Sequence, residues 1–216
     1  MVEQLPAYVI VMFVLAMVPG PDMMIIMKNT LALNRRAGRI TLTGILAGHL
    51  FWIAISVVGL AVIIANSPAI FNTIKYLGAF YLIYIGIQSL RAGVLVPRQS
   101  IDHIDSLKET VSRKSLIQSF RQGFVANILN PKVLILYMTI IPQFVTGEGQ
   151  TTLGYNQQIL LLAAILLIVS IIWFMTVVEL VNLLKRWMKS HVFQNWLSKG
   201  AGAVIIFFGV RTLLWG

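Results

Sequence analysis

The sequence Met17-Val18-Pro19-Gly20-Pro21-Asp22 interrupts an apolar run that extends from Leu5 to Met27. Each proline lacks a backbone N–H and clashes with the preceding helical turn, and the intervening glycine adds backbone freedom. We therefore expect a helix to break here. In hydrocarbon, the backbone groups freed by a break are costly unless they are buried in protein or line a cavity. Many secondary transporters build their substrate sites from such broken helices. The alternative is a structural kink that neighbouring helices pack against.

The composition is that of an integral membrane protein. Of the 216 residues, 58% are hydrophobic and only 11% are charged, and the mean hydropathy is +0.84. A soluble domain usually carries about 25% charged residues. The length allows roughly six membrane spans of about 20 residues each, so we expect a single transmembrane domain over residues 1–216. The absence of cysteine excludes disulfides and thiolate metal sites, and we expect neither a cofactor nor a bound metal.

Six apolar segments predict an all-α, polytopic fold with six transmembrane helices. Asn130-Pro131-Lys132 repeats the proline break inside the fourth segment, so spans 1 and 4 are both expected to be broken. A polar connection over about 91–121 and a short loop over 146–157 flank that fourth span. The expected spans are 5–27, 40–65, 69–90, 122–145, 158–184 and 200–215.

The distribution of Lys and Arg predicts the orientation. The connections after spans 1, 3 and 5 hold four, six and four of the seventeen Lys and Arg residues, and those after spans 2 and 4 hold none. By the positive-inside rule the basic connections are cytoplasmic, and both termini face outward, into the periplasm of a bacterial cell. The same distribution argues against a basic face for nucleic acid, despite the net charge of +10.

The two halves of the chain resemble each other. Residues 77–90 align without gaps on residues 200–213, which places Gly86 on Gly209, and Pro21-Asp22 aligns with Pro131-Lys132. We predict two three-helix repeats, over about 1–95 and 115–216. An odd number of spans per half makes such repeats inverted with respect to each other in the membrane.

Asp22 and Lys132 are the charged residues expected deepest within the spans. A charge at mid-span costs about 2.5–3.5 kcal/mol on insertion scales, so both side chains should face the protein interior. In the functional interpretation, Asp22 receives an ammonium group or a proton and Lys132 attracts a carboxylate. In the structural interpretation, the two form an ion pair that holds the broken helices together. The two interpretations are compatible if substrate or proton binding competes with the pair.

Three further features each have a structural interpretation beside a functional one. The small residues at Gly44 and Gly48 favour close helix packing rather than a functional role. His49 is either a proton relay or a hydrogen-bonded structural histidine. Glu179 is expected to pair with the nearby Lys185-Arg186 cluster at the membrane interface.

No hydrolase triad, phosphate loop or zinc motif occurs in the sequence, so we expect no enzyme.

The motifs resemble those of the lysine exporter and homoserine/threonine exporter (LysE/RhtB type) superfamily of bacterial amino-acid efflux proteins. The resemblance covers the chain end to end, and its most specific part is the pairing of Pro-Gly-Pro-Asp with Asn-Pro-Lys about 110 residues later. The matching stretches are Pro19–Asp22, Gly44–His49, Tyr76–Gly86, Phe120–Phe124, Asn127–Lys132 and Ile141–Phe144.

The resemblance implies a multi-pass exporter in the cytoplasmic (inner) membrane that moves amino acids or related metabolites outward by proton antiport. Its partners would be the amino-acid substrate, protons and the lipid bilayer, and a homo-oligomer is compatible with it. A zwitterion suits the site, because helix N-termini and Lys132 favour its carboxylate while Asp22 favours its ammonium. The candidate substrate-binding or coupling residues are Pro19, Gly20, Pro21, Asp22, His49, Asn130, Pro131 and Lys132. The alternatives are a non-transporting membrane scaffold and an exporter of a metal cation.

Overall fold

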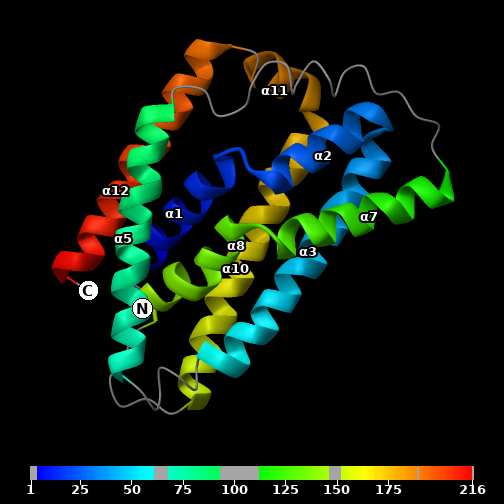
Figure 1. Cartoon of the computed structure of the whole chain (residues 1–216). Helices are drawn as coiled ribbons and strands as arrows, with labels where there is room; N and C mark the ends of the chain where they lie inside the picture. Colours follow the sequence, from blue (N-terminus) through cyan, green and yellow to red (C-terminus); the bar gives the residue numbers. More distant parts are fainter. Residues whose placement is uncertain (1–3, 61–67, 93–111, 146–151, 189, 216) are drawn as a thin grey trace.

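The computed structural model describes residues 4–60, 68–92, 112–145, 152–188 and 190–215, and every regular element within these ranges is helical (Figure 1). The elements are α1 (Leu5–Met17), α2 (Pro21–Ala32), α3 (Arg35–Ile55), the π-helix η2 (Ser56–Leu60), α5 (Pro68–Ala92), α7 (Arg113–Ile128), α8 (Pro131–Ile135), the π-helix η3 (Leu136–Ile140), α9 (Ile141–Gln143), α10 (Thr152–Glu179), α11 (Val181–Met188) and α12 (His191–Trp215).

Both proline motifs break their helices, as the sequence predicts. α1 ends at Met17 and α2 begins at Pro21, with a bend of 52° between them. In the second half, α7 ends at Ile128 and the helical segment that begins with Pro131 is bent from it by 53°. In each break the second element opens with a proline at its first position, where the missing N–H would have no helical acceptor.

Two stretches in the described ranges are long and apolar enough to cross a membrane as single helices, Arg35–Gly59 and Gly154–Glu179. The number rises to four if each bent pair counts as one span. α5 and α12 contain the predicted third and sixth spans, 69–90 and 200–215. By length and composition, the described ranges thus hold two to four helical stretches that could cross a membrane, and the arrangement of six inverted spans stays a prediction.

Several predicted boundaries are wrong, because polar segments continue as helix. α7 begins at Arg113 rather than at 122, since the Ser112 side chain accepts a hydrogen bond from Ser115 N and the Ser115 hydroxyl accepts one from Ser112 N. This reciprocal cap starts the helix within the basic connection. α10 likewise begins at Thr152, inside the expected loop 146–157. α11 and the first turns of α12 occupy most of the basic segment expected to be a loop after the fifth span.

Glycines bring α3 and α7 into backbone contact. A Cβ added to Gly44 would lie 2.1 Å from the carbonyl oxygen of Phe120, and one added to Gly123 would lie 2.1 Å from the carbonyl oxygen of Thr41. No side chain fits at either position without moving the helices apart. The prediction that the Gly44–Gly48 stretch serves close packing is therefore confirmed.

A second glycine-mediated contact joins α5 to α12, the green and red helices that run side by side in Figure 1. A Cβ on Gly86 would meet Ile206 Cγ1 at 2.5 Å, and a Cβ on Gly209 would meet Ile83 Cγ1 at 2.7 Å. The two helices thus contact each other through reciprocal pairs of one glycine and one isoleucine.

The interior contains two apolar clusters that meet along α10. One cluster joins α1, the α8–α9 segment and the first half of α10, and includes Leu15, Val133 and Leu166. The other joins α2, α3 and the second half of α10, and includes Met23 and Phe174. The first break lies between these clusters, since Leu15 before it belongs to one and Met23 after it belongs to the other.

Candidate functional site

Asp22 lies just after the first break, in the first turn of α2, and its side chain is buried with 3% exposure. One carboxylate oxygen, Oδ2, accepts a hydrogen bond of 2.9 Å from the side-chain amide of Asn127 on α7. The other oxygen, Oδ1, is buried and has no hydrogen-bond partner. The N-terminal end of a helix favours a negative charge. The carboxylate is thus held by Asn127, and the amide of Asn130 lies near it without a hydrogen bond of good geometry.

Asn127 connects Asp22 to His49. The same amide nitrogen, Nδ2, lies 3.3 Å from His49 Nε2, and His49 Nδ1 lies 3.3 Å from the hydroxyl of Tyr137 on η3. Asn127 and Tyr137 are fully buried, and His49 is 3% exposed. A polar chain of four side chains therefore runs from the break in the first bent helix to the segment after the break in the second.

Sequence reasoning assigned no role to Asn127 or Tyr137. Asn127 lies one helical turn before Asn130 in an otherwise weakly polar stretch, and a polar residue at that spacing from a helix break is a signal that points to the interior. Tyr137 has no comparable signal, because an isolated tyrosine in an apolar run usually belongs to the core.

Lys132 reaches across to the other broken helix. Its Nζ donates hydrogen bonds of 3.1 Å to the carbonyl oxygens of Leu15 and Val18, at the C-terminal end of α1. Such carbonyls have no helical donor, and a cation suits the negative end of a helix. Lys132 and Asp22 line the same cavity, as their expected approach requires. They form no ion pair, because no nitrogen–oxygen distance between them is 4.0 Å or less.

The remaining residues of the two motifs shape the breaks. Asn130 caps α8, since its Oδ1 accepts a hydrogen bond of 3.0 Å from Lys132 N, while its buried Nδ2 has no partner. Pro21 and Pro131 begin α2 and α8. Gly20 lies against the end of the Lys132 side chain: a Cβ at this position would lie 3.4 Å from Lys132 Nζ. Pro19 lies within the break itself.

A small cavity of about 30 Å³ adjoins these groups. Its polar lining comes from Asp22, His49, Lys132 and Ser170, and apolar residues of both clusters complete the wall. The volume is about that of one water molecule in the liquid. In this conformation the site holds its charged groups close together and admits no solute as large as an amino acid.

Gly48 fixes the position of Asn127. A Cβ at Gly48 would lie 2.5 Å from Asn127 Oδ1 and 2.8 Å from Asn127 Cβ. The glycine before His49 is therefore required for the amide to approach α3.

Glu179 has two basic partners that the sequence did not predict. It pairs with Arg35 and Arg39 of α3, whereas the side chain of Lys185, one of its expected partners, lies outside the described residues. The nitrogen–oxygen distance to Arg35 is 3.3 Å, and Arg39 makes a closer contact. α10 ends at Glu179 and turns into α11, so its carboxylate faces the start of α3. Exposed pairs of this kind contribute little stability.

The arrangement allows a limited chemistry. A buried carboxylate, an imidazole and a phenol are connected, so protons can be held or exchanged among them, and the open Oδ1 can accept a hydrogen bond from a cation. Within the described ranges, no group of three or more His, Asp or Glu side chains is arranged to hold a metal ion.

Comparison with known proteins identifies the class to which the chain belongs, that of membrane translocators. The chain belongs to the LysE type translocator family, whose model matches residues 13–216. The expected membership of this superfamily is confirmed, and the family is one of transporters.

Three relatives are similar over different lengths. The uncharacterized membrane protein YrhP of Bacillus subtilis (strain 168) is 38% identical over 213 residues, which cover 97% of this chain and 98% of that protein. The threonine efflux protein of Escherichia coli (strain K12) is 24% identical over 92% of this chain and 91% of its own length. The leucine efflux protein of Salmonella choleraesuis (strain SC-B67) is 28% identical over 64% of this chain and 61% of its own length. No solved structure matches the chain.

Proposed function

We propose that this protein exports amino acids across the cytoplasmic membrane in exchange for protons. The observation that carries the proposal is the buried Asp22 carboxylate, which lies at a helix break and has one oxygen without a partner. The family and the names of the leucine and threonine efflux relatives support export of an amino acid. Intramembrane carboxylates at helix breaks are a recurring feature of transporter substrate and ion sites.

The site has complementary groups for a zwitterion. Asp22 Oδ1 and Asn127 Oδ1 are buried acceptors without partners, and they suit an ammonium group. Lys132 suits a carboxylate, but it already donates to the Leu15 and Val18 carbonyls. A substrate carboxylate that binds Lys132 therefore competes with the capping of α1. Substrate binding would change the first break, which provides a physical connection between binding and conformation.

Proton coupling follows from competition at the same oxygen. A proton on Asp22 removes the negative charge that attracts the substrate ammonium, so the proton and the substrate bind alternately. Asp22 is the leading coupling residue, and His49, joined to it through Asn127, is the second candidate. Alternate occupancy of one carboxylate is sufficient for antiport, provided that each bound form is exposed to a different side of the membrane.

The contacts between α5 and α12 support an inverted repeat. When Leu77 is aligned with Gly200, Gly86 falls on Gly209 and Ile83 falls on Ile206. Exchanging the two halves therefore converts the contact of Gly86 with Ile206 into a contact of Gly209 with Ile83. This second contact is also observed. The bends of 52° and 53° in the two broken helices agree with the same symmetry. We include six spans, two inverted halves and outward-facing termini in the proposal.

Reconstitution into liposomes tests the proposal. Proteoliposomes that contain labelled leucine or threonine should release it faster than protein-free liposomes, and an imposed pH gradient should drive accumulation against the amino-acid gradient. Asp22→Asn should retain its fold and lose the pH-driven accumulation. Glu179→Gln is the matched control, since it removes a carboxylate from a partly exposed ion pair.

The outcomes separate the candidates. If no amino acid crosses in any sample of folded wild-type protein, the non-transporting scaffold is favoured. If Asp22→Asn accumulates substrate as well as the wild type does, Asp22 has no role in coupling.

A further inference from the structure

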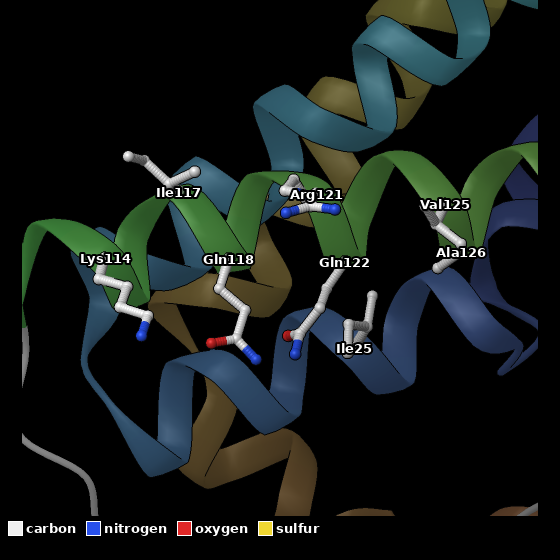
Figure 2. A pocket seen from close by; sticks show the side chains of 8 residues that line it. All are labelled: Ile25, Lys114, Ile117, Gln118, Arg121, Gln122, Val125 and Ala126. Carbon is white, nitrogen blue, oxygen red and sulfur yellow. The ribbon is translucent and has the colours of Figure 1, made fainter.

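A much larger hollow is lined by residues of α7 and by Ile25 of α2. The groove between α2 and α7 has a volume of about 650 Å³ (Figure 2). It extends along α7 from Lys114, in the first turn, to Ala126, next to Asn127. On the α2 side it is lined by Ile25, one turn beyond Asp22. The groove thus begins at the first turn of α7 and ends one helical turn from Asp22 on α2 and one residue before Asn127 on α7, and it shares no lining residue with the small cavity.

The polar side chains of the groove form a row. Lys114, Gln118 and Gln122 are spaced four residues apart, which places them on one face of the helix, and Figure 2 shows all three directed toward α2. Ile25 and Val125 provide aliphatic surface near the inner end. A solute in this groove would meet amides along one wall and hydrocarbon at the inner end.

The charges at the groove have one sign. Lys114 and Arg121 line the groove, and Lys28 lines a smaller pocket of about 60 Å³ that shares Gln118 and Gln122 with it. All charged residues in these two linings are cations. A cleft with charges of one sign and low-dielectric walls concentrates ions of the opposite sign and raises their rate of association.

We propose that this groove is the route by which a solute with a carboxylate group reaches the Asp22 site from the cytoplasm. The inference rests on the proposed function and on the predicted orientation, in which α7 begins at the cytoplasmic side. Lys114 and Arg121 attract the carboxylate, and Ile25 and Val125 contact an aliphatic side chain. The aliphatic residues of the lining and the repulsion of a second positive charge together favour an amino acid with an apolar side chain over a basic one.

Single cysteines test the groove without any measurement of transport. The chain has no cysteine of its own, so Gln118→Cys and Gln122→Cys each introduce one reactive thiol. In inside-out vesicles, the rate with a negatively charged thiosulfonate relative to the rate with its positively charged analogue should be roughly tenfold higher at both thiols than at Phe120→Cys, a comparison that cancels the intrinsic preference of a thiolate for a cationic reagent. The preference should vanish when Lys114→Gln and Arg121→Gln are added. Phe120→Cys is the control, since Phe120 is on α7 and 37% exposed but does not line the groove.

Two results would overturn the inference. The same ratio of the two rates at the groove thiols and at Phe120→Cys would show that the cations do not act on the groove. Reaction with a lipid-soluble maleimide only would show that lipid fills it. Gln118, Lys114 and Arg121 are exposed and Gln122 is half-buried, so these variants are expected to fold.

Export measurements separate this inference from the proposed function. Lys114→Gln with Arg121→Gln should raise the leucine concentration for half-maximal export about tenfold, with little change in the maximal rate, because the cations act on association. Arg113→Gln, an exposed cation outside the groove lining, should leave both values unchanged. Unchanged export by the double variant contradicts the groove route alone. Absence of export in every sample contradicts the proposed function and leaves the labelling result to decide whether the groove attracts anions.

Discussion

At the scale of single residues, Asn127 has the most exacting surroundings. Its amide nitrogen serves both Asp22 and His49, its Oδ1 is buried without a partner, and its side chain packs against Gly48. The amide has little freedom to move without losing one of these contacts. Asn127 is thus a positioning residue that sets the distance between the carboxylate and the imidazole.

Gly48→Ala tests this role. The added methyl group would lie 2.8 Å from Asn127 Cβ, so the backbone or the amide must shift, and overpacking of this kind costs about 1–3 kcal/mol. We expect a lower unfolding temperature in detergent and loss of pH-driven accumulation. Gly59→Ala is the matched control, because nothing lies within 4 Å of a Cβ there. If the two variants behave alike in both assays, the close contact at Gly48 has no role in positioning Asn127.

The sequence anticipated the charged residues of the site better than their partners. Asp22 and Lys132 were expected to be interior because a mid-span charge is costly, and the structure places Asp22 in the interior and Lys132 at the same cavity. One interpretation of the sequence joined the two in an ion pair, which is not the contact that Lys132 makes in the structure. Lys132 binds carbonyls instead, because the break in the first helix frees acceptors that the sequence pattern does not display.

At the scale of elements, the two breaks follow directly from proline chemistry, whereas the helix ends do not. Loss of two N–H donors within three residues prevents a continuous helix whatever the surroundings. The start of α7 depends instead on the reciprocal cap between Ser112 and Ser115. Because this segment is polar, it was expected to belong to the connection before the fourth span. For the same reason, the first residues of α10 were expected in the loop over 146–157, although the helix begins at Thr152.

Replacing Pro19 and Pro21 together with alanine tests the importance of the first break. The missing N–H groups return, so α1 and α2 should join into one helix, and the carbonyls that now accept from Lys132 gain backbone donors. We expect normal abundance with at least a tenfold loss of export in the liposome assay.

The proline-to-alanine variant has a useful control at the other end of the chain. Gly200→Ala removes backbone freedom in α12, where nothing lies within 4 Å of a Cβ, and it should leave export intact. Near-normal export by the Pro19→Ala, Pro21→Ala protein would mean that the break is a tolerated kink.

At the scale of the whole molecule, the Lys and Arg asymmetry predicts which side of the membrane each end faces. Gln4 precedes α1, and His191 begins α12 within the basic segment that the positive-inside rule assigns to the cytoplasm. A membrane-impermeant thiol reagent added to intact cells should label Gln4→Cys and not His191→Cys. Permeabilised cells should show labelling of both, as a check on abundance and reactivity. The opposite pattern in intact cells would reverse the orientation and place the groove of Figure 2 on the outer side.

The cavity beside Asp22 has a kinetic consequence. Its volume of about 30 Å³ matches one water molecule, and an amino acid is several times larger. For the proposed exporter, the broken helices must therefore separate during every turnover, and the work of separating them forms part of the activation barrier. Motions of this kind take microseconds to milliseconds. Each turnover then includes a conformational step, so the protein delivers solute in discrete cycles rather than as the continuous current of a channel.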